Sequence, residues 1–400
     1  MTRIRLGLAG VGIAALQVVD NLKSLDNEIE LTALADIRAE NMELFCERFG
    51  RDVSTYGDVH EMLRSPEVDA VWVATPNAFH AEHTIAAARA GKHVICEKPM
   101  AVTLEQCREM VAAVEKAGVK YVQGHSKIYD VPIRKMGEIL QSGEIGEVVS
   151  IQTWNWNDWL IRALMPAEVD TDQGAGVVFR QGPHQIDIVR FLGGGRVRSV
   201  RASAGRHAPH FPKCEGNYTA FLEFDNGVPA TMVFDGYGYF DVAELTWGIG
   251  ESGKRLKNPD STAKRYRPKG PVTAEEKYAQ VRAGNPYGYG AGGGVDPKSP
   301  VRTPFFGLTV VTCEKGVLRQ SPDGVYVYDE NGRREVPCPP HRGRAAELME
   351  LVESVRSDRP TLLDARWGMA TAEVCLAILQ SSRERREVMM TEQTDAPVLS

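Results

Sequence analysis

The chain has 400 residues, more than one ordinary domain holds, so two domains are expected. A hydrophobic fraction of 43% and a charged fraction of 25% are typical of a globular protein with a sizeable core and exclude a low-complexity chain. The formal net charge of −6 at pH 7 argues against a nucleic-acid partner.

Residues 1–125 alternate short apolar runs with helical patterns. This β-α alternation predicts a doubly wound parallel sheet with helices on both faces. Gly91 follows one helical pattern as a natural C-terminal cap. The predicted strands are 4–9, 29–35, 70–75, 93–96 and 120–123, and the helical patterns include 37–49 and 78–90.

Residues 126–400 are predicted to form a second, α+β domain. After about residue 150 the strands are longer and are separated by turn residues, which favours a large, mostly antiparallel sheet. Asp225-Asn226-Gly227 is a strong hairpin signal, and a second hairpin is expected around 321–324. The other predicted elements are strands 148–156, 197–204, 220–224, 230–234, 316–319 and 325–328 and closing helices 342–357 and 364–383.

Residues 251–302 stand apart from this pattern. They hold eleven Lys and Arg against five Asp and Glu and are rich in Gly and Pro. A structureless loop of this length is unusual inside a compact domain. Two interpretations stay open: a solvated insertion, or an arm that crosses a subunit interface or covers an active site.

Cysteines and apolar runs bear on the compartment. The seven cysteines are scattered without a CxxC pair, and the nine histidines lack zinc-ligand spacing, so neither disulfides nor a metal are expected. No apolar run approaches the roughly 18 residues of a membrane helix. The N-terminus enters a strand without a signal peptide, and we expect a cytoplasmic protein that does not bind membranes.

Residues 10–15, Gly-Val-Gly-Ile-Ala-Ala, fit the G-x-G-x-x-[GA] motif of a dinucleotide-binding Rossmann domain. Gly10 would make the tight turn after the first strand, and Gly12 would let a pyrophosphate approach the backbone beside Ile13. The N-terminus of the following helix would supply free N–H groups. A tight turn without a nucleotide is the alternative.

Asp36 ends the second predicted strand, 26 residues after Gly10. A carboxylate at this place accepts hydrogen bonds from ribose hydroxyls and repels a 2′-phosphate, so NAD is favoured. Arg38 could instead receive a 2′-phosphate, so NADP stays the alternative. Ile37, between the two, is counted with the cofactor-binding residues.

Two further segments carry a family resemblance. Thr75-Pro76-Asn77 with His80, and the run from Gly91 to Glu97-Lys98-Pro99, resemble the Gfo/Idh/MocA family of glucose–fructose oxidoreductase, inositol dehydrogenase and relatives. The resemblance implies a nicotinamide-dependent dehydrogenase with an open-faced sheet and homodimers or homotetramers built on it. It also implies cofactor contacts by Thr75, Pro76, Asn77, His80, Glu97 and Lys98.

The lysine of the Glu-Lys-Pro tripeptide has a proton-transfer role in this family, and the resemblance carries that role to Lys98. An ammonium beside a nicotinamide cation has a lowered pKa and can exchange a proton with a substrate hydroxyl. Lys98 is therefore predicted to contact both cofactor and substrate. A cis bond before the proline, Pro99 here, is frequent in the family.

The family's second motif, D-x-G-x-H-x-x-D, corresponds to residues 180–187, Arg-Gln-Gly-Pro-His-Gln-Ile-Asp. The resemblance makes His184 the proton-transfer partner, with Asp187 supporting it; a core histidine bonded to the backbone is the alternative. The first acid is replaced by Arg180, which puts a plain sugar or inositol in doubt. A guanidinium suits a substrate carboxylate, so Arg180 is predicted to bind one, unless it pairs with a protein acid such as Asp187 or reaches solvent.

Three tryptophans, at 154, 156 and 159, open the second domain. Strand alternation sends Trp154 and Trp156 to one face, as sheet core or as a wall against a flat ligand, and Trp156 is a candidate substrate contact.

Segments 181–184, 305–307 and 313–314 resemble a subgroup that acts on cis-dihydrodiols of aromatic acids. The leading hypothesis is the oxidation of such a diol carboxylate with NAD. The alternatives are a sugar, inositol or sugar-acid dehydrogenase and a non-catalytic NAD-binding sensor.

Overall fold

The computed structural model describes residues 3–124, 126–205, 210–257, 270–282, 295–341 and 343–399. Two compact units make up the chain: residues 1–125 with 342–372, and residues 126–341 with 373–400. The sequence analysis places 342–372 in the second domain, whereas this segment packs with the first unit. Ala365, Met369 and Ala372 belong to the apolar core of that unit, and an apolar helix face does not by itself say which core it will join.

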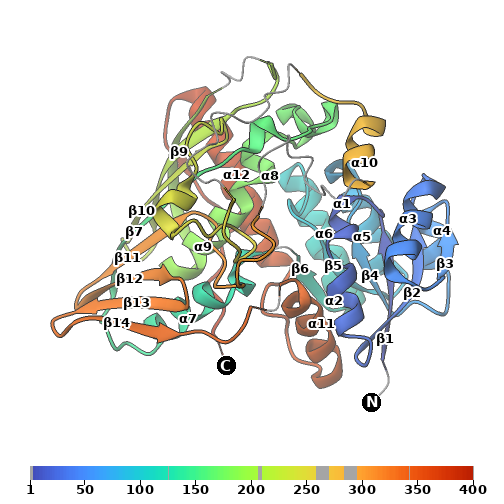
Figure 1. Cartoon of the computed structure of the whole chain (residues 1–400), viewed down its shortest axis with the longest axis horizontal. Helices are drawn as coiled ribbons and strands as arrows, with labels where there is room; N and C mark the ends of the chain where they lie inside the picture. The colour runs from blue at the N-terminus through green and yellow to red at the C-terminus, as the bar shows by residue number, and fades with distance from the viewer. Residues whose placement is uncertain are drawn as a thin grey trace. The chain divides into compact units, whose positions relative to one another are not determined.

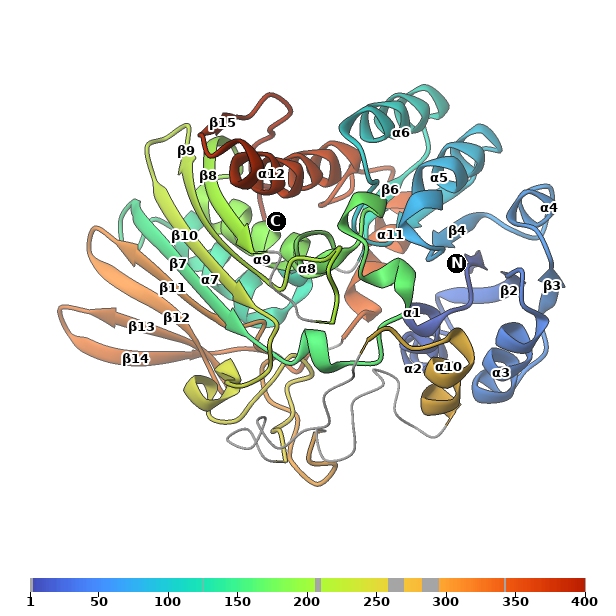
Figure 2. The ribbon, with the colours of Figure 1, turned by 90° about the horizontal axis from the view of Figure 1, so that it is seen from above.

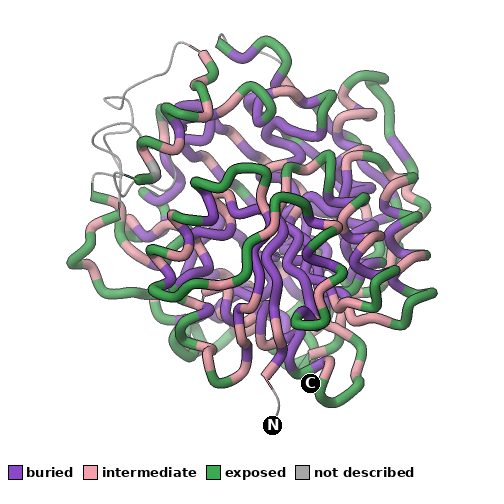
Figure 3. The backbone as a smooth tube through the Cα atoms, turned by 90° about the vertical axis from the view of Figure 1, so that its right-hand side faces the viewer, coloured by how far each residue is buried: buried purple, intermediate pink, exposed green. Residues whose placement is uncertain are grey.

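The first unit holds a six-stranded sheet in the order β3-β2-β1-β4-β5-β6, with every pair parallel. Apart from the edge strand β3, its strands are buried along most of their length, as in parallel sheets with both faces covered (Figure 3). This is the predicted doubly wound Rossmann sheet. The strands are β1 (Ile4–Ala9), β2 (Ile29–Ala35), β3 (Ser54–Tyr56), β4 (Ala70–Val73), β5 (His93–Cys96) and β6 (Tyr121–Gln123).

Helices connect these strands, and their ends follow capping rules. Thr103 and Gln106 form a capping box at the start of α6, and Gly118 ends that helix in the left-handed conformation. The helix expected after the glycine loop is divided into two short ones, α1 and α2. The helices of the unit are α1 (Ile13–Leu16), α2 (Val19–Ser24), α3 (Ala39–Phe49), α4 (Val59–Leu63), α5 (His80–Arg89), α6 (Leu104–Ala117), α11 (Ala345–Ser357) and the first part of α12 (Ala365–Glu384).

The second unit holds a nine-stranded sheet in the order β14-β13-β12-β11-β7-β10-β9-β8-β15. Among the described strand pairs of this second sheet only β7 and β10 are parallel, so the sheet is mostly antiparallel, as predicted. Both expected hairpins are present, at 225–227 and between Ser321 and Gly324. The strands are β7 (Val148–Trp156), β8 (Val197–Gly205), β9 (Asn217–Phe224), β10 (Pro229–Asp235), β11 (Leu308–Cys313), β12 (Gly316–Ser321), β13 (Gly324–Asp329), β14 (Gly332–Pro337) and β15 (Val388–Met389).

Helices cover one face of this sheet, and no described helix lies along the other (Figure 2). On β10, for example, Ala230, Met232 and Phe234 are buried and alternate with half-exposed residues. The open-faced sheet implied by the family resemblance is therefore present. The helices of the unit are α7 (Val131–Gln141), α8 (Gly176–Arg180), α9 (Gly182–Gly193), α10 (Ala274–Arg282) and the last part of α12, with single turns at Lys127–Tyr129, Trp159–Ile161, Pro166–Glu168, Thr171–Gln173 and Val242–Thr246 (Figure 1).

The basic insertion, 251–302, is described at 251–257, 270–282 and 295–302. It contains α10, whose Lys277 is 4% exposed, while the other described residues of 270–282 are half-exposed or exposed. The prediction for the remaining residues, 258–269 and 283–294, lies outside the described residues. No helix in the described parts of the chain has the length and apolarity to cross a membrane, and no disulfide joins the seven cysteines.

Candidate active site

The glycine loop joins β1 to α1 in the first unit. Gly10 has a φ of +85°, and a Cβ atom there would lie 2.6 Å from the backbone nitrogen of Thr75. Only glycine meets both conditions, so this loop and the end of β4 run in direct contact. Gly12 caps α1 with extended backbone angles, and 12–14 remain partly exposed. The loop can therefore receive a ligand against its backbone, as the motif predicts.

Asp36 follows β2 directly and faces the glycine loop. Its carboxylate accepts the N–H of Val11 at 2.8 Å on Oδ2 and the N–H of Arg38 at 2.8 Å on Oδ1, with the Asn41 amide at 3.3 Å. Each carboxylate oxygen can accept two bonds, so Oδ2 keeps capacity for a ribose hydroxyl. Ile37 is 91% exposed beside it, which suits an apolar cover for a flat base. These residues fit a bound dinucleotide.

His80 opens α5 and is 1% exposed. Its Nδ1 lies 2.7 Å from the carbonyl oxygen of Pro99 and its Nε2 lies 2.8 Å from that of Thr75. Burial lowers the pKa of His80, although both carbonyls favour its protonated form. The ring thus ties the loop after β4 to the loop after β5. His80 thus positions both loops, and its contact with the cofactor stays a prediction. Pro76 and Asn77, on the same loop, are more exposed.

Lys98 follows β5 and is the one residue between 94 and 101 that is not buried. The Lys98–Pro99 peptide is cis, as is frequent in the resembled family. Because Gly10 contacts the end of β4 and His80 joins that loop to Pro99, the candidate residues Gly10, Thr75 and Lys98 belong to one edge of the parallel sheet, at the carboxyl ends of its strands. This edge is where doubly wound sheets bind ligands.

Glu97 differs from its neighbour Lys98 because it is 5% exposed. Its carboxylate pairs with Arg344, which also bonds to Glu347 at 3.3 Å and stacks over Trp72 at 4.5 Å. Burial opposes the charge of Arg344, but the carboxylates of Glu347 and Glu97 raise its pKa. Glu97 therefore takes part in an internal ion pair that holds the Glu-Lys-Pro segment, and its contact with the cofactor stays a prediction.

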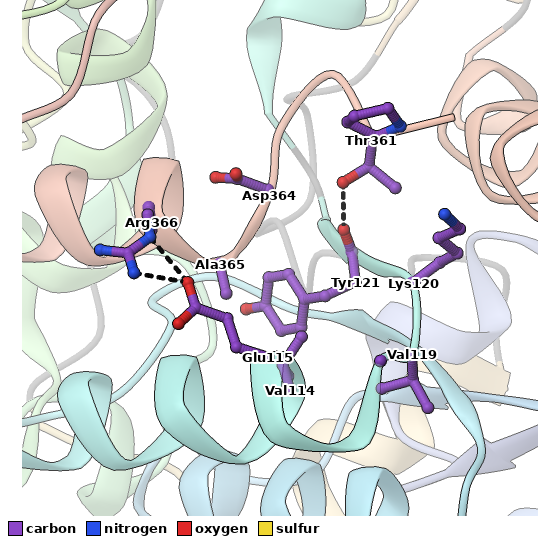
Figure 4. A pocket seen from close by; sticks show the side chains of 11 residues that line it. Val114, Glu115, Val119, Lys120, Tyr121, Thr361, Asp364, Ala365 and Arg366 are labelled. Atoms are coloured by element: carbon purple, nitrogen blue, oxygen red, sulfur yellow. Dashed lines mark hydrogen bonds and ion pairs between the residues drawn. The ribbon is translucent and has the colours of Figure 1, made fainter. Parts of the chain in front are cut away.

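A pocket in the first unit lies elsewhere (Figure 4). It is lined by the end of α6, the start of β6 and the segment before α12, and it includes Glu115 bonded to Arg366 and Tyr121 bonded to Thr361. It sits where β6 begins, so it belongs to the amino-terminal edge of the sheet. Since the glycine loop and Lys98 follow strands at the other edge, this pocket is not the candidate site.

One group of side chains in the described residues has metal-binding donors. His60, Glu82 and His83 bring their donor atoms within 4.8 Å of one another. His60 Nε2 already lies 3.2 Å from Glu82 Oε1, and His83 Nδ1 lies 3.0 Å from the hydroxyl of Thr75. These contacts explain the cluster without a metal.

His184 lies in the first turn of α9 and is 3% exposed. Its ring meets the edge of Phe306 at a centroid distance of 4.9 Å. The ammonium of Lys127 lies 5.7 Å from the centre of the same Phe306 ring and 3.7 Å from Asp130 Oδ2. The sequence analysis did not single out Lys127, because a lone lysine carries no motif.

Gln185 fixes the helix that carries His184. Its Nε2 donates to the carbonyl oxygens of Thr153 and Val233, each at 3.1 Å, and its Oε1 accepts the hydroxyl of Tyr218 at 2.6 Å. One buried amide thus joins α9 to three strands. This connection positions His184, and Asp187 is buried on the same helix.

Arg180 ends α8 and bonds to Glu168 Oε1 at 3.0 Å. Its protein partner in this contact is thus Glu168, and not the Asp187 named in the sequence analysis. The Arg180 side chain is still 31% exposed. From 174 to 193 it is the one residue that is not buried, so a ligand of the second unit can reach it.

The tryptophans of β7 lie on the open face. Thr153 and Asn155 are buried under the helices, and Trp154, which alternates with them, is 40% exposed. Trp156 alternates in the same way and contacts Phe240 at 5.7 Å. The expected shared face is present, but it is opposite to the face that packs on α9, so this placement gives the predicted substrate contact of Trp156 no support.

Comparisons with known proteins agree with this arrangement. A family model described as the oxidoreductase family with an NAD-binding Rossmann fold matches residues 4–125, and the GFO/IDH/MocA C-terminal domain matches 133–241. The chain is 32% identical over 386 residues to 1-carboxy-3-chloro-3,4-dihydroxycyclohexa-1,5-diene dehydrogenase of Comamonas testosteroni, covering 95% of both chains. It is 31% identical over 200 residues to myo-inositol 2-dehydrogenase of Thermotoga maritima, covering 50% of this chain and 58% of that one. A crystal structure of a dehydrogenase from Bordetella bronchiseptica RB50 is similar, with a TM-score of 0.84 and 34% identity over 97% of this chain and 100% of that one.

Proposed function

This chain is an NAD(P)-binding dehydrogenase of the Gfo/Idh/MocA family, and from that premise we propose that it oxidises a cyclic cis-dihydrodiol carboxylate to the dihydroxy aromatic acid. The reaction is that of phthalate 4,5-cis-dihydrodiol dehydrogenase, the enzyme it resembles. Arg180 carries the proposal, because it stands where the resembled polyol enzymes have an acid and its guanidinium is accessible. The Comamonas relative, named for a dihydroxycyclohexadiene that bears a carboxyl group, supports the same substrate class.

Lys98 takes the proton of the substrate hydroxyl in this proposal, and His184 is its proton-transfer partner. NAD, held by the glycine loop and Asp36, would supply the hydride acceptor for the carbon that bears this hydroxyl. The product of this step is a ring ketone, which enolises to the aromatic diol, so aromatisation drives the oxidation forward. Lys98 suits the role because it is half-exposed on a loop fixed by His80.

NAD is the proposed cofactor. Asp36 points its carboxylate at the glycine loop, where it would accept the ribose hydroxyls and repel a 2′-phosphate. Arg38 donates its backbone N–H to Asp36 and is exposed, and its side chain is the alternative contact, for a 2′-phosphate. We therefore keep NAD ahead of NADP.

A second copy of the chain is the proposed partner of the open sheet face. Trp154 lies between Leu308 and Val233 on neighbouring strands, which makes an apolar strip across the sheet on the exposed side. Such a strip favours a homodimer or homotetramer built on this face. Light scattering would measure the mass, and Trp154→Lys should lower it toward the monomer; an unchanged mass would place the interface elsewhere.

The substrate is tested by an absorbance screen for reduced nicotinamide with carboxylated cis-dihydrodiols and polyols side by side. We expect turnover of the diol acids with NAD. Turnover of inositol or glucuronate alone would favour a sugar or sugar-acid dehydrogenase, which the inositol relative also represents. Tight NAD binding without any hydride transfer would favour a sensor.

A further inference from the structure

The insertion helix α10 contacts Glu168 within the second unit. Oε1 of Glu168 accepts Arg180 Nη2 at 3.0 Å, and Oε2 accepts the ammonium of Lys277 and the N–H of Met165, the latter at 2.8 Å. The side chains of Arg180, Glu168 and Lys277 are 31%, 10% and 5% exposed. Arg180 is thus the most exposed of the three, and Glu168 pairs it with the more deeply buried Lys277.

The charges of this trio do not cancel. Burial opposes ionisation of Glu168, but Arg180 and Lys277 hold its pKa below the usual range, so it is an anion at neutral pH. Burial lowers the pKa of Lys277, and the ion pair with Glu168 opposes this shift. The nearby Arg162 brings its own counter-charge, Asp158, at 3.1 Å. Arg180 and Lys277 both pair with Glu168, so the three side chains together carry one net positive charge.

An Arg180–Glu168 pair alone would be neutral, and Glu168 would repel an approaching carboxylate. Lys277 removes that repulsion from the buried side, while the accessible charge stays on Arg180. We propose that Arg180, Glu168 and Lys277 form a carboxylate subsite in which Lys277, contributed by the insertion, neutralises Glu168 so that Arg180 can bind the carboxylate of the substrate. The proposal rests on the proposed function for the identity of the substrate and assigns a role to α10 that the sequence left open.

Two substitutions with opposite effects on the local charge test this subsite. Lys277→Met leaves a neutral Arg180–Glu168 pair, whereas Glu168→Gln leaves two cations and keeps an acceptor for Arg180. The probes are benzoate and phthalate, titrated calorimetrically into the full-length enzyme with NADH. Lys277→Met should weaken their binding by roughly tenfold or more. Glu168→Gln should tighten it, and the double variant should return to within about threefold of the unmodified protein, since its net charge is again +1.

Controls separate charge from packing. Lys277→Arg should bind the probes as the unmodified protein does, and Lys213→Met, which removes an exposed lysine paired with Asp170, should change nothing. Circular dichroism at rising temperature would identify a variant that fails to fold, and the double variant and Lys277→Arg then still decide the question. If Lys277→Met and Glu168→Gln both weakened binding of the probes, and the double variant did not restore it, the proposed subsite would be wrong.

Kinetics distinguish this proposal from the proposed function. If the unmodified enzyme turns over no diol acid, the proposed function fails, while the benzoate titrations still report on the subsite. If it does turn them over, Lys277→Met should raise KM for the carboxylated diol by roughly tenfold and affect the diol without a carboxylate less. An equal rise for both substrates would show that Lys277 only anchors α10.

Discussion

Lys98 in the first unit and Arg180 in the second are both single accessible cations in otherwise buried segments, 94–101 and 174–193. They are held in different ways. The Lys98 loop is fixed through its neighbours, because His80 bonds to Pro99 and Glu97 pairs with Arg344. Arg180 is fixed through its own guanidinium, on Glu168.

This difference matches the two proposed roles. A base that exchanges a proton changes its charge during the reaction, so it is best positioned by contacts that its own charge does not control. A group that binds a carboxylate must stay charged, and a counter-ion helps to keep it so. Four predictions test this comparison.

The largest effect is expected at Lys98. Lys98→Met removes the proton-transfer group and should lower kcat by roughly 10² to 10⁴. NADH affinity, measured by fluorescence titration, should change little, because the loop is held by His80 and Glu97. Near-normal turnover would remove Lys98 from the chemistry, and lost NADH binding would show that its side chain also holds the loop.

Arg180→Leu should have the next largest effect, and on one class of substrate. Loss of one partner of a buried charge pair costs about 2–5 kcal/mol, so kcat/KM for the carboxylated diol should fall by at least roughly 25-fold. The fall should be smaller for an analogue without the carboxylate. Equal losses on both would make Arg180 a structural residue that holds Glu168.

Asp36→Ala should lower kcat/KM with NAD and raise it with NADP. The ratio of the two values should change by roughly tenfold or less. Initial rates with both cofactors measure this ratio. Asp36→Asn is the matched control, because it keeps the shape and an acceptor but removes the charge that repels a 2′-phosphate. If the unmodified enzyme prefers NADP, Arg38 controls the choice.

The smallest effect concerns the loss of stability at acid pH, which should be greater in the first unit than in the second. Burial lowers the pKa of His80, His83 and His93 in the first unit, and of His341 in the second. All are neutral above about pH 6.5 in both folded and unfolded chains, so they contribute nothing there. Below that pH these histidines bind protons in the unfolded chain but stay neutral in the folded chain. The free energy of unfolding therefore falls until the native pKa values are reached.

Hydrogen exchange at about pH 7.5 and about pH 5.5 measures this per unit, and the first unit should lose more protection. His93→Gln should reduce the loss, because His93 Nδ1 accepts the N–H of Lys120 at 3.0 Å and protonation breaks that bond. An equal loss in both units would show that other groups dominate.

Much of the fold was predictable from local patterns. The bounds of β1, β2, β5 and β7 coincide with the predicted ones, because each is an apolar or alternating run between turn residues. The glycine loop was also predictable from a local pattern, because its residues are adjacent and each meets a requirement of the backbone at its own position. The break between α1 and α2 was not, as nothing in their residue types marks it.

The amino-acid sequence by itself determined the two folds, the cofactor loop and the positions of Lys98, His184 and Arg180. The tertiary structure decided which groups surround them. Glu168 meets Arg180 across 12 residues and Lys277 across 109, and Glu97 meets Arg344 across 247. Such partners are set by how distant elements pack, and periodicity carries no information on that. The charge of the Arg180 subsite therefore depends on the packing of the insertion helix against Glu168, which the sequence pattern does not indicate.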